Sequence, residues 1–118
     1  EALALGLKCG LTLDIMQKVM QTTMAWNNQL AVAMPKKAFI GDDAPGFAIR
    51  LAGKDVRLAC ELAERIGFEP RIGRAGFAAL NAATHKGYGD RDTARLMFIL
   101  EDQLGIEARQ QPAQKKAD

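Results

Sequence analysis

Apolar residues recur every three to four positions along most of the chain, with Gly, Pro and polar residues between the segments. This spacing is typical of amphipathic helices, and no segment alternates apolar and polar residues as a half-buried strand does. We therefore predict an all-α fold, an orthogonal array of about six helices joined by short connections. The predicted helices cover residues 1–9, 12–22, 25–34, 48–66, 72–86 and about 92–104.

Capping and helix-breaking residues mark the ends of these segments. Gly10 suits the left-handed residue that ends a helix, and Thr12 can cap the helix that follows. Pro35 is predicted to end the third helix and to open the longest irregular stretch, residues 35–46. Asp90 or Asp92 is expected to cap the last helix.

The central helix is predicted to bury one apolar face. The residues expected on that face are Ala52, Val56, Ala59, Cys60, Ala63 and Ile66. Cys9 and Cys60 each fall on an apolar helix face, so we expect both to be small core residues. Two irregularly placed cysteines predict no disulfide framework, which favours a reducing, cytoplasmic setting.

Length and composition are those of one globular domain. The chain has 118 residues, of which 48% are hydrophobic and 25% are charged. Sixteen Lys and Arg against fourteen Asp and Glu leave a net charge of +2, which gives no case for a nucleic-acid or membrane partner. No apolar run approaches the roughly 20 residues that a transmembrane helix needs.

The two ends of the sequence carry different signals. The first residues are already in a helical pattern, with neither Met nor a capping residue before them, so we expect a longer helix entered partway along. Residues 107–118 are polar, contain one Pro and lack apolar periodicity, which predicts a flexible tail.

Conventional catalytic and metal-binding motifs are absent. His85 is the sole histidine, which argues against a multi-histidine zinc site and against a Ser-His-Asp arrangement. Its position at the end of a predicted helix favours a structural role. No glycine-rich run has the spacing of a P-loop. We therefore expect no metal site.

One charged residue departs from the solvated pattern of the central helix. Asp55 lies on a flank with apolar residues on the turns before and after it, so its carboxylate needs a partner. Gly53 is unfavourable inside a helix and suggests that another group approaches the backbone closely. Phe47, Lys54 and Asp55 together predict one wall of a cleft. The alternative is that Asp55 pairs with an Arg, Lys54 is a solvated charge and Phe47 is a core anchor.

Three ordered blocks resemble the helical C-terminal domain of the β-hydroxyacid dehydrogenases, the 3-hydroxyisobutyrate dehydrogenase-like family related to 6-phosphogluconate dehydrogenase. The run Pro45-Gly46-Phe47, continued by Leu51 and Lys54-Asp55-Val56-Arg57-Leu58-Ala59, is similar to the family's "PGF…L…KDL.LA" signature. Residues 1–11 resemble the end of the long interdomain helix, and residues 87–94 resemble the "G.GD.D.SA" turn. The resemblance spans residues 1–106.

The resemblance implies a C-terminal domain, residues 1–106, whose N-terminal Rossmann domain is absent from this chain. Family members bind NAD or NADP in the Rossmann domain. Their proton-transfer lysine lies in a segment that is absent from these 118 residues. The full-length protein is expected to oxidise a small 3-hydroxy acid, or to reduce a semialdehyde, in the cytoplasm. The fragment alone is expected to bind no cofactor and to be inactive. The residues that select the acid, and NAD against NADP, are expected in the missing domain.

The resemblance assigns roles to three positions. Lys54 matches the lysine that reaches towards the cofactor, and Asp55 matches a supporting catalytic and substrate-binding aspartate that orients the catalytic lysine. Phe47 matches the aromatic that shapes the substrate pocket. Gly53 departs from the family, in which a larger apolar residue is common.

Two alternatives come from other functional classes. This domain type also supplies subunit contacts, so the chain can be a non-catalytic helical oligomerisation module. A helix-turn-helix DNA-binding domain is disfavoured by the near-neutral charge. We also expect the isolated chain to dimerise, because the truncated first helix would expose Leu3 and Leu7.

Overall fold

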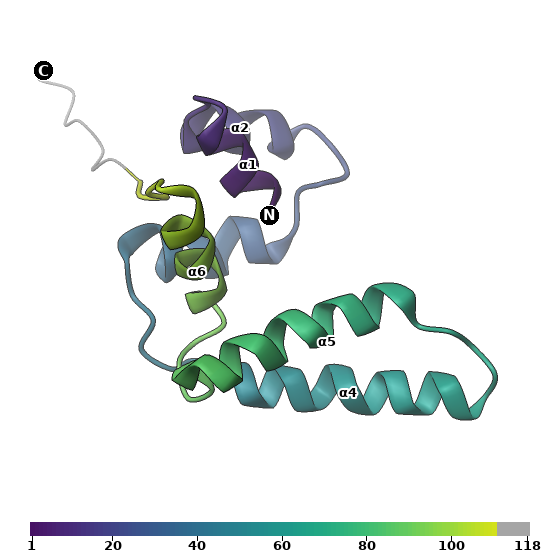
Figure 1. The fold of residues 1–118 in the computed structure, drawn as a ribbon. Helices are drawn as coiled ribbons and strands as arrows, with labels where there is room; N and C mark the ends of the chain where they lie inside the picture. Colours follow the sequence, from purple (N-terminus) through teal and green to yellow (C-terminus); the bar gives the residue numbers. More distant parts are fainter. Residues whose placement is uncertain (111–118) are drawn as a thin grey trace, which may run out of the picture. The chain divides into compact units, whose positions relative to one another are not determined.

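The computed structural model describes residues 1–110, and this part of the chain is all helical, as predicted (Figure 1). An isolated antiparallel bridge joins Ala48 and Asp92, and no strand forms within residues 1–110. The described residues form two compact units. The first comprises residues 1–42 and 97–110, and the second comprises residues 43–96. The elements are α1 (Ala2–Lys8), α2 (Leu13–Gln21), a π-helix (Gln29–Ala33), α3 (Met34–Lys36), a 3₁₀ turn (Ala38–Ile40), α4 (Ile49–Arg65), α5 (Arg71–Ala83), a second π-helix (Thr84–Tyr88) and α6 (Arg95–Leu104).

The second unit is built on a hairpin of α4 and α5 (Figure 1). The helices pack closely where α5 carries Gly73, because a Cβ atom there would lie 2.9 Å from Sγ of Cys60. The approach at Gly53 is looser, since a Cβ atom would meet Cβ of Leu80 at an ordinary 3.6 Å. The residue that needs to be glycine in this hairpin is therefore Gly73, and the close approach predicted at Gly53 is wrong.

The buried face of α4 differs from the predicted one. Its buried residues are Ile49, Gly53 and Cys60, spaced by four and seven positions. That spacing forms a narrow stripe, in which Gly53 and Cys60 face Leu80 and Gly73 of α5. Ala59 and Ile66 were expected in the core, but Ala59 is exposed and Ile66 is 74% exposed. Cys60 is buried, which confirms the expectation for this cysteine.

The first unit begins with α1 and α2, whose junction has the predicted capping residues. Gly10 has a φ of +88°, and Oγ1 of Thr12 accepts a hydrogen bond from the amide of Ile15 at 3.3 Å. Cys9, just past the end of α1, is exposed, so the expectation that it is a core residue is wrong. Leu3 is only 5% exposed and Leu7 is half-buried, so the expectation that α1 exposes both leucines is wrong, while dimerisation of the isolated chain stays a prediction.

The third predicted helix begins later and runs further than expected. The helical segment starts at Gln29, because Oδ1 of Asn27 accepts the amide of Leu30 at 3.1 Å and so caps it. It continues through Pro35 to Lys36, and Pro35 lies where the π-helix passes into the short α3. The stretch 35–46 is also less irregular than predicted, because its 3₁₀ turn buries Ala38 and Phe39.

Residues 107–110 are held to the first unit, contrary to the prediction of a tail from residue 107. The amide of Ala108 donates to Oε1 of Glu101 at 2.8 Å, and the guanidinium of Arg109 binds both oxygens of the same carboxylate at 2.6 and 3.2 Å. Ala108 is fully buried. The rest of the predicted tail, residues 111–118, lies outside the described residues. Within residues 1–110, no helix has the length and hydrophobicity needed to cross a bilayer.

Candidate functional site

All three residues predicted to line a cleft lie in the second unit. Phe47 precedes the first residue of α4 by two positions, and Lys54 and Asp55 lie within the helix. With a rise of about 1.5 Å per helical residue, the start of α4 and Asp55 are about 9 Å apart along the axis. All three side chains face solvent, with exposed fractions of 47% for Phe47, 53% for Lys54 and 57% for Asp55.

Lys54 and Asp55 form an ion pair with each other. Nζ of Lys54 lies 2.9 Å from Oδ1 of Asp55. The carboxylate therefore finds its partner in the adjacent residue, and the alternative that it pairs with an arginine is wrong. Because both side chains are more than half exposed, this pair contributes little to stability, roughly 0–1 kcal/mol. Both charged ends remain accessible to a ligand or to another part of a larger protein.

Asp55 lies on the face of α4 that is turned away from α5. A helix turns about 100° per residue, so Asp55 is about 200° from Gly53, which contacts Leu80 of α5. The same outer face carries leucines that are 38–60% exposed: Leu51, Leu58 and Leu62. The predicted apolar flank around Asp55 is therefore present, and it forms an exposed surface of the second unit.

The backbone at Phe47 is fixed by the carboxylate of Asp92. The amides of Gly46 and Phe47 both donate to Oδ2 of Asp92 at 2.9 Å, and the amide of Thr93 donates to the carbonyl of Phe47 at 3.1 Å. Asp92 is only 6% exposed. The Phe47 side chain projects from this braced backbone and is 47% exposed, so the alternative that it anchors the core is wrong.

The start of α4 is tied to residues 89–92 by further backbone hydrogen bonds. The amide of Ile49 donates to the carbonyl of Arg91, and the amide of Arg50 donates to the carbonyl of Gly89, each at 2.9 Å. These bonds satisfy amides at the first turn of the helix, which have no partner inside α4. Residues 46–50 and 89–93 thus form one braced junction.

A cluster around Arg95 lies in the same unit. The guanidinium stacks over the ring of Tyr88 at 4.3 Å and lies 3.3 Å from Oδ2 of Asp43. A hydrogen bond to Tyr88 and the charges of Tyr88 and Asp43 raise the pKa of Arg95 against the opposing effect of burial. Asp43 also pairs with Arg91 at 3.4 Å. The cluster fixes the segment that leads into the Pro45-Gly46-Phe47 turn.

Sequence patterns assigned Asp92 only a capping role at the last helix. The carboxylate does accept the amide of Ala94 at 2.9 Å through Oδ1, which confirms Asp92 as a residue that caps this turn. Its bonds to Gly46 and Phe47 were missed, because a single sequence gives no signal that pairs positions 45 residues apart.

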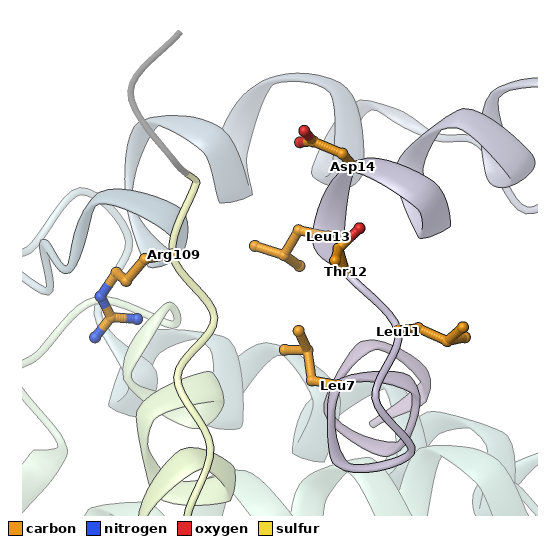
Figure 2. Close-up of a pocket in the computed structure, with 6 residues that line it drawn as sticks. All are labelled: Leu7, Leu11, Thr12, Leu13, Asp14 and Arg109. Carbon is orange, nitrogen blue, oxygen red and sulfur yellow. The ribbon is translucent and has the colours of Figure 1, made fainter. Parts of the chain in front are cut away.

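A pocket of about 250 Å³ lies in the first unit and contains none of the three predicted site residues (Figure 2). It is lined by Leu7, Leu11, Thr12, Leu13, Asp14 and Arg109. The side chains of Leu7 and Leu13 extend into it. Arg109 is engaged by the carboxylate of Glu101, so its charge serves the fold. In the part of the chain described, no group of three or more His, Cys, Asp or Glu residues is placed to hold a metal ion.

Comparison with known proteins gives a family match over most of the chain. The family described as "NAD-binding of NADP-dependent 3-hydroxyisobutyrate dehydrogenase" matches residues 1–100. Similar proteins are 3-sulfolactaldehyde reductase of Escherichia coli K12 (28% identity, covering 92% of this chain and 37% of the relative) and 2-(hydroxymethyl)glutarate dehydrogenase of Eubacterium barkeri (28%, 90% and 35%). L-threonate dehydrogenase of Haemophilus influenzae is 28% identical over 84% of this chain and 33% of its own length. The chain thus spans about a third of these relatives.

Proposed function

Because the chain belongs to the 3-hydroxyisobutyrate dehydrogenase family, we propose that it is the C-terminal helical domain of an NAD(P)-dependent 3-hydroxyacid dehydrogenase. In this proposal it forms one wall of the substrate and cofactor cleft. The observation that carries it is the Lys54–Asp55 ion pair, which is exposed at the surface of α4. Phe47 lies two positions before the first residue of the same helix. The rest of the cleft comes from an N-terminal Rossmann domain in the full-length protein.

The described residues fit a partial cofactor site. No strand occurs among residues 1–110, so the strand-turn-helix that cradles a dinucleotide pyrophosphate must come from elsewhere. The ammonium group of Lys54 is a flexible donor at the surface, suited to a ribose hydroxyl or a carboxamide oxygen. NAD or NADP, when bound, supplies a hydride acceptor for the hydroxyl-bearing carbon of the substrate. Lys54 holds the cofactor at this wall of the cleft.

Asp55 and Phe47 act on the substrate side. The Asp55 carboxylate, set among exposed leucines, accepts hydrogen bonds from the substrate or from the proton-transfer lysine that the full-length protein supplies. Phe47 shapes the pocket and excludes water from it. The substrate is a small 3-hydroxy acid, or the corresponding semialdehyde in the reverse direction. The two thiols are free, which supports a cytoplasmic protein.

The experiment compares this chain with the full-length protein. Each is incubated with NAD or NADP and a panel of small 3-hydroxy acids, and formation of reduced nicotinamide is recorded. We expect turnover by the full-length protein and none by the isolated chain, which lacks the Rossmann domain and the proton-transfer lysine. Turnover by the isolated chain, or none by the full-length protein with any acid of the panel, would contradict the proposal.

A second candidate function is a non-catalytic helical oligomerisation module. The exposed leucines on the outer face of α4, Leu51, Leu58 and Leu62, favour it, because apolar side chains at helical spacing are typical of subunit contacts. The catalytic proposal also expects a homo-oligomer, so mass alone does not separate the two. A full-length protein that assembles but has no lysine at the proton-transfer position would favour the module.

A further inference from the structure

We propose that Asp92 is a positioning residue for the substrate pocket. It fixes the backbone at Phe47 and thereby the position of the Phe47 side chain. The proposal rests on the pocket role given to Phe47 in the proposed function. Asp92 itself is 6% exposed and is bonded to the backbone on both sides, so it acts through Phe47 and not on the substrate.

The carboxylate joins two segments that are far apart in sequence. Oδ2 accepts the amides of Gly46 and Phe47, each at 2.9 Å, while Oδ1 accepts the amide of Ala94 at 2.9 Å. Three backbone donors therefore converge on one buried side chain. Hydrogen bonds to an ionised acceptor are about twice as strong as those between neutral groups. The turn that carries Phe47 is therefore fixed by two charge-assisted hydrogen bonds to Asp92.

Asp92 supplies the side-chain hydrogen bonds to the backbone at Phe47, beside the backbone bonds of the braced junction. The side chain of Phe47 is 47% exposed, so packing constrains it less than it does a core residue. Phe47 also lies before the first residue of α4, outside the ladder of helical hydrogen bonds. The amide of Thr93, the residue next to Asp92, also donates to the carbonyl of Phe47.

A carboxylate is needed for this arrangement. Asparagine has the same shape but only one acceptor oxygen, and its amide nitrogen would face backbone donors. In Asp92→Asn, either the Gly46 and Phe47 amides or the Ala94 amide lose their acceptor. Serine is shorter and retains an acceptor for the nearby Ala94 amide, but it does not reach Gly46 and Phe47. Asp92→Ser therefore removes the bond to the Phe47 turn selectively.

The test uses steady-state kinetics of the full-length protein with its best 3-hydroxy acid. We expect Asp92→Asn and Asp92→Ser to lower kcat/KM for the acid about tenfold and to leave the KM for the nicotinamide cofactor unchanged. The matched control is Asp90→Asn, because Asp90 is exposed and its carboxylate pairs with Arg50. We expect this control to retain the wild-type kinetics.

A double-mutant cycle separates positioning from general destabilisation. In a Phe47→Ala background, the two Asp92 substitutions should cause no further loss, because the side chain that they misplace is gone. A further tenfold loss in that background would overturn the proposal. So would a kcat/KM for the acid that is unchanged in both Asp92 variants.

Hydrogen exchange gives a readout that does not need activity. We expect the amides of Gly46 and Phe47 to exchange at least tenfold faster in Asp92→Ser, while amides in the middle of α5 keep their rates. Unchanged exchange at residues 46–47 would overturn the proposal. If the wild-type protein oxidises no 3-hydroxy acid, the proposed function fails, and the exchange result still decides whether Asp92 fixes this turn. Should Asp92→Asn not fold, Asp92→Ser supplies both measurements.

Discussion

The carboxylate of Asp92 accepts the backbone amide of Phe47 at 2.9 Å, although the two residues are 45 positions apart. Residues 89–93 thereby fix the entrance to α4, and α4 carries the ion pair on its outer face. The three candidate site residues thus lie on or beside one helix whose first turn is braced from outside. Under the proposed function, this brace would hold Phe47 in place at one wall of the cleft.

Removal of the Lys54 ammonium should weaken cofactor binding. In the full-length protein, Lys54→Ala is expected to raise the KM for NAD or NADP about tenfold, or about 1.4 kcal/mol. The exposed ion pair contributes little to folding, so thermal stability should stay within about 1 kcal/mol of wild type. Arg57→Ala is the matched control, since Arg57 is an exposed cation on the same helix that pairs with Glu61. An unchanged cofactor KM in Lys54→Ala would contradict the cofactor role.

Loss of the Asp55 carboxylate should slow turnover. Asp55→Ala is expected to lower kcat about tenfold or more, because the substrate and the proton-transfer group lose a hydrogen-bond acceptor. The KM for the cofactor should rise less than in Lys54→Ala. Glu61→Ala removes a carboxylate elsewhere on α4 and should leave kcat unchanged. Equal kcat values for Asp55→Ala and the wild type would contradict a catalytic role and leave Asp55 as a surface charge.

The two glycines of the α4–α5 hairpin should respond oppositely to alanine. Gly53→Ala is expected to stabilise the chain by up to about 1 kcal/mol, because alanine favours the helix. The new Cβ atom makes only an ordinary contact, at 3.6 Å from Leu80. Gly73→Ala is expected to destabilise it by about 1–3 kcal/mol, since its Cβ atom would lie 2.9 Å from Sγ of Cys60. Urea unfolding of both variants measures the difference, and the same sign for both would refute the packing described.

The buried carboxylate of Glu101 should matter more for stability than its exposed neighbour. Glu101→Gln weakens the pair with Arg109 and the bond from the amide of Ala108, so we expect a loss of about 2–3 kcal/mol in the free energy of unfolding. Asp102→Asn, at the adjacent exposed position, should change stability by less than about 0.5 kcal/mol. Chemical denaturation of the two variants provides the comparison. Similar losses in both would argue against the contacts of residues 107–110.

Local signals predicted the central helix almost to the residue. The expected segment was 48–66, and the observed helix α4 is Ile49–Arg65. The two agree because both ends are marked in sequence. Gly67, which follows the helix, has a φ of +80°. The helix expected at 25–34 was misplaced, since its start depends on the side chain of Asn27 and its end on how Pro35 fits the first turn of α3. Propensity rules do not distinguish a proline that ends a helix from one that begins it.

The candidate site was predicted in part. The apolar flank around Asp55 follows from helical spacing. Its exposure follows from its position on the face of α4 that is turned away from α5. The pairing of Asp55 with Lys54 was not predicted, because sequence spacing favours partners three or four positions away. The brace from Asp92 was missed for a different reason: it is a long-range contact, and its two segments share no periodic pattern.

The tight contact between Gly73 and the thiol of Cys60 makes that sulfur a reporter of whether the hairpin is closed. An alkylating reagent modifies an exposed thiol directly, as at Cys9, but modifies a shielded thiol only after the helices separate. The labelling rate of Cys60 relative to Cys9 therefore measures how often α4 and α5 part under native conditions. No residue has to be introduced for this measurement, since one buried and one exposed thiol are already present in the chain.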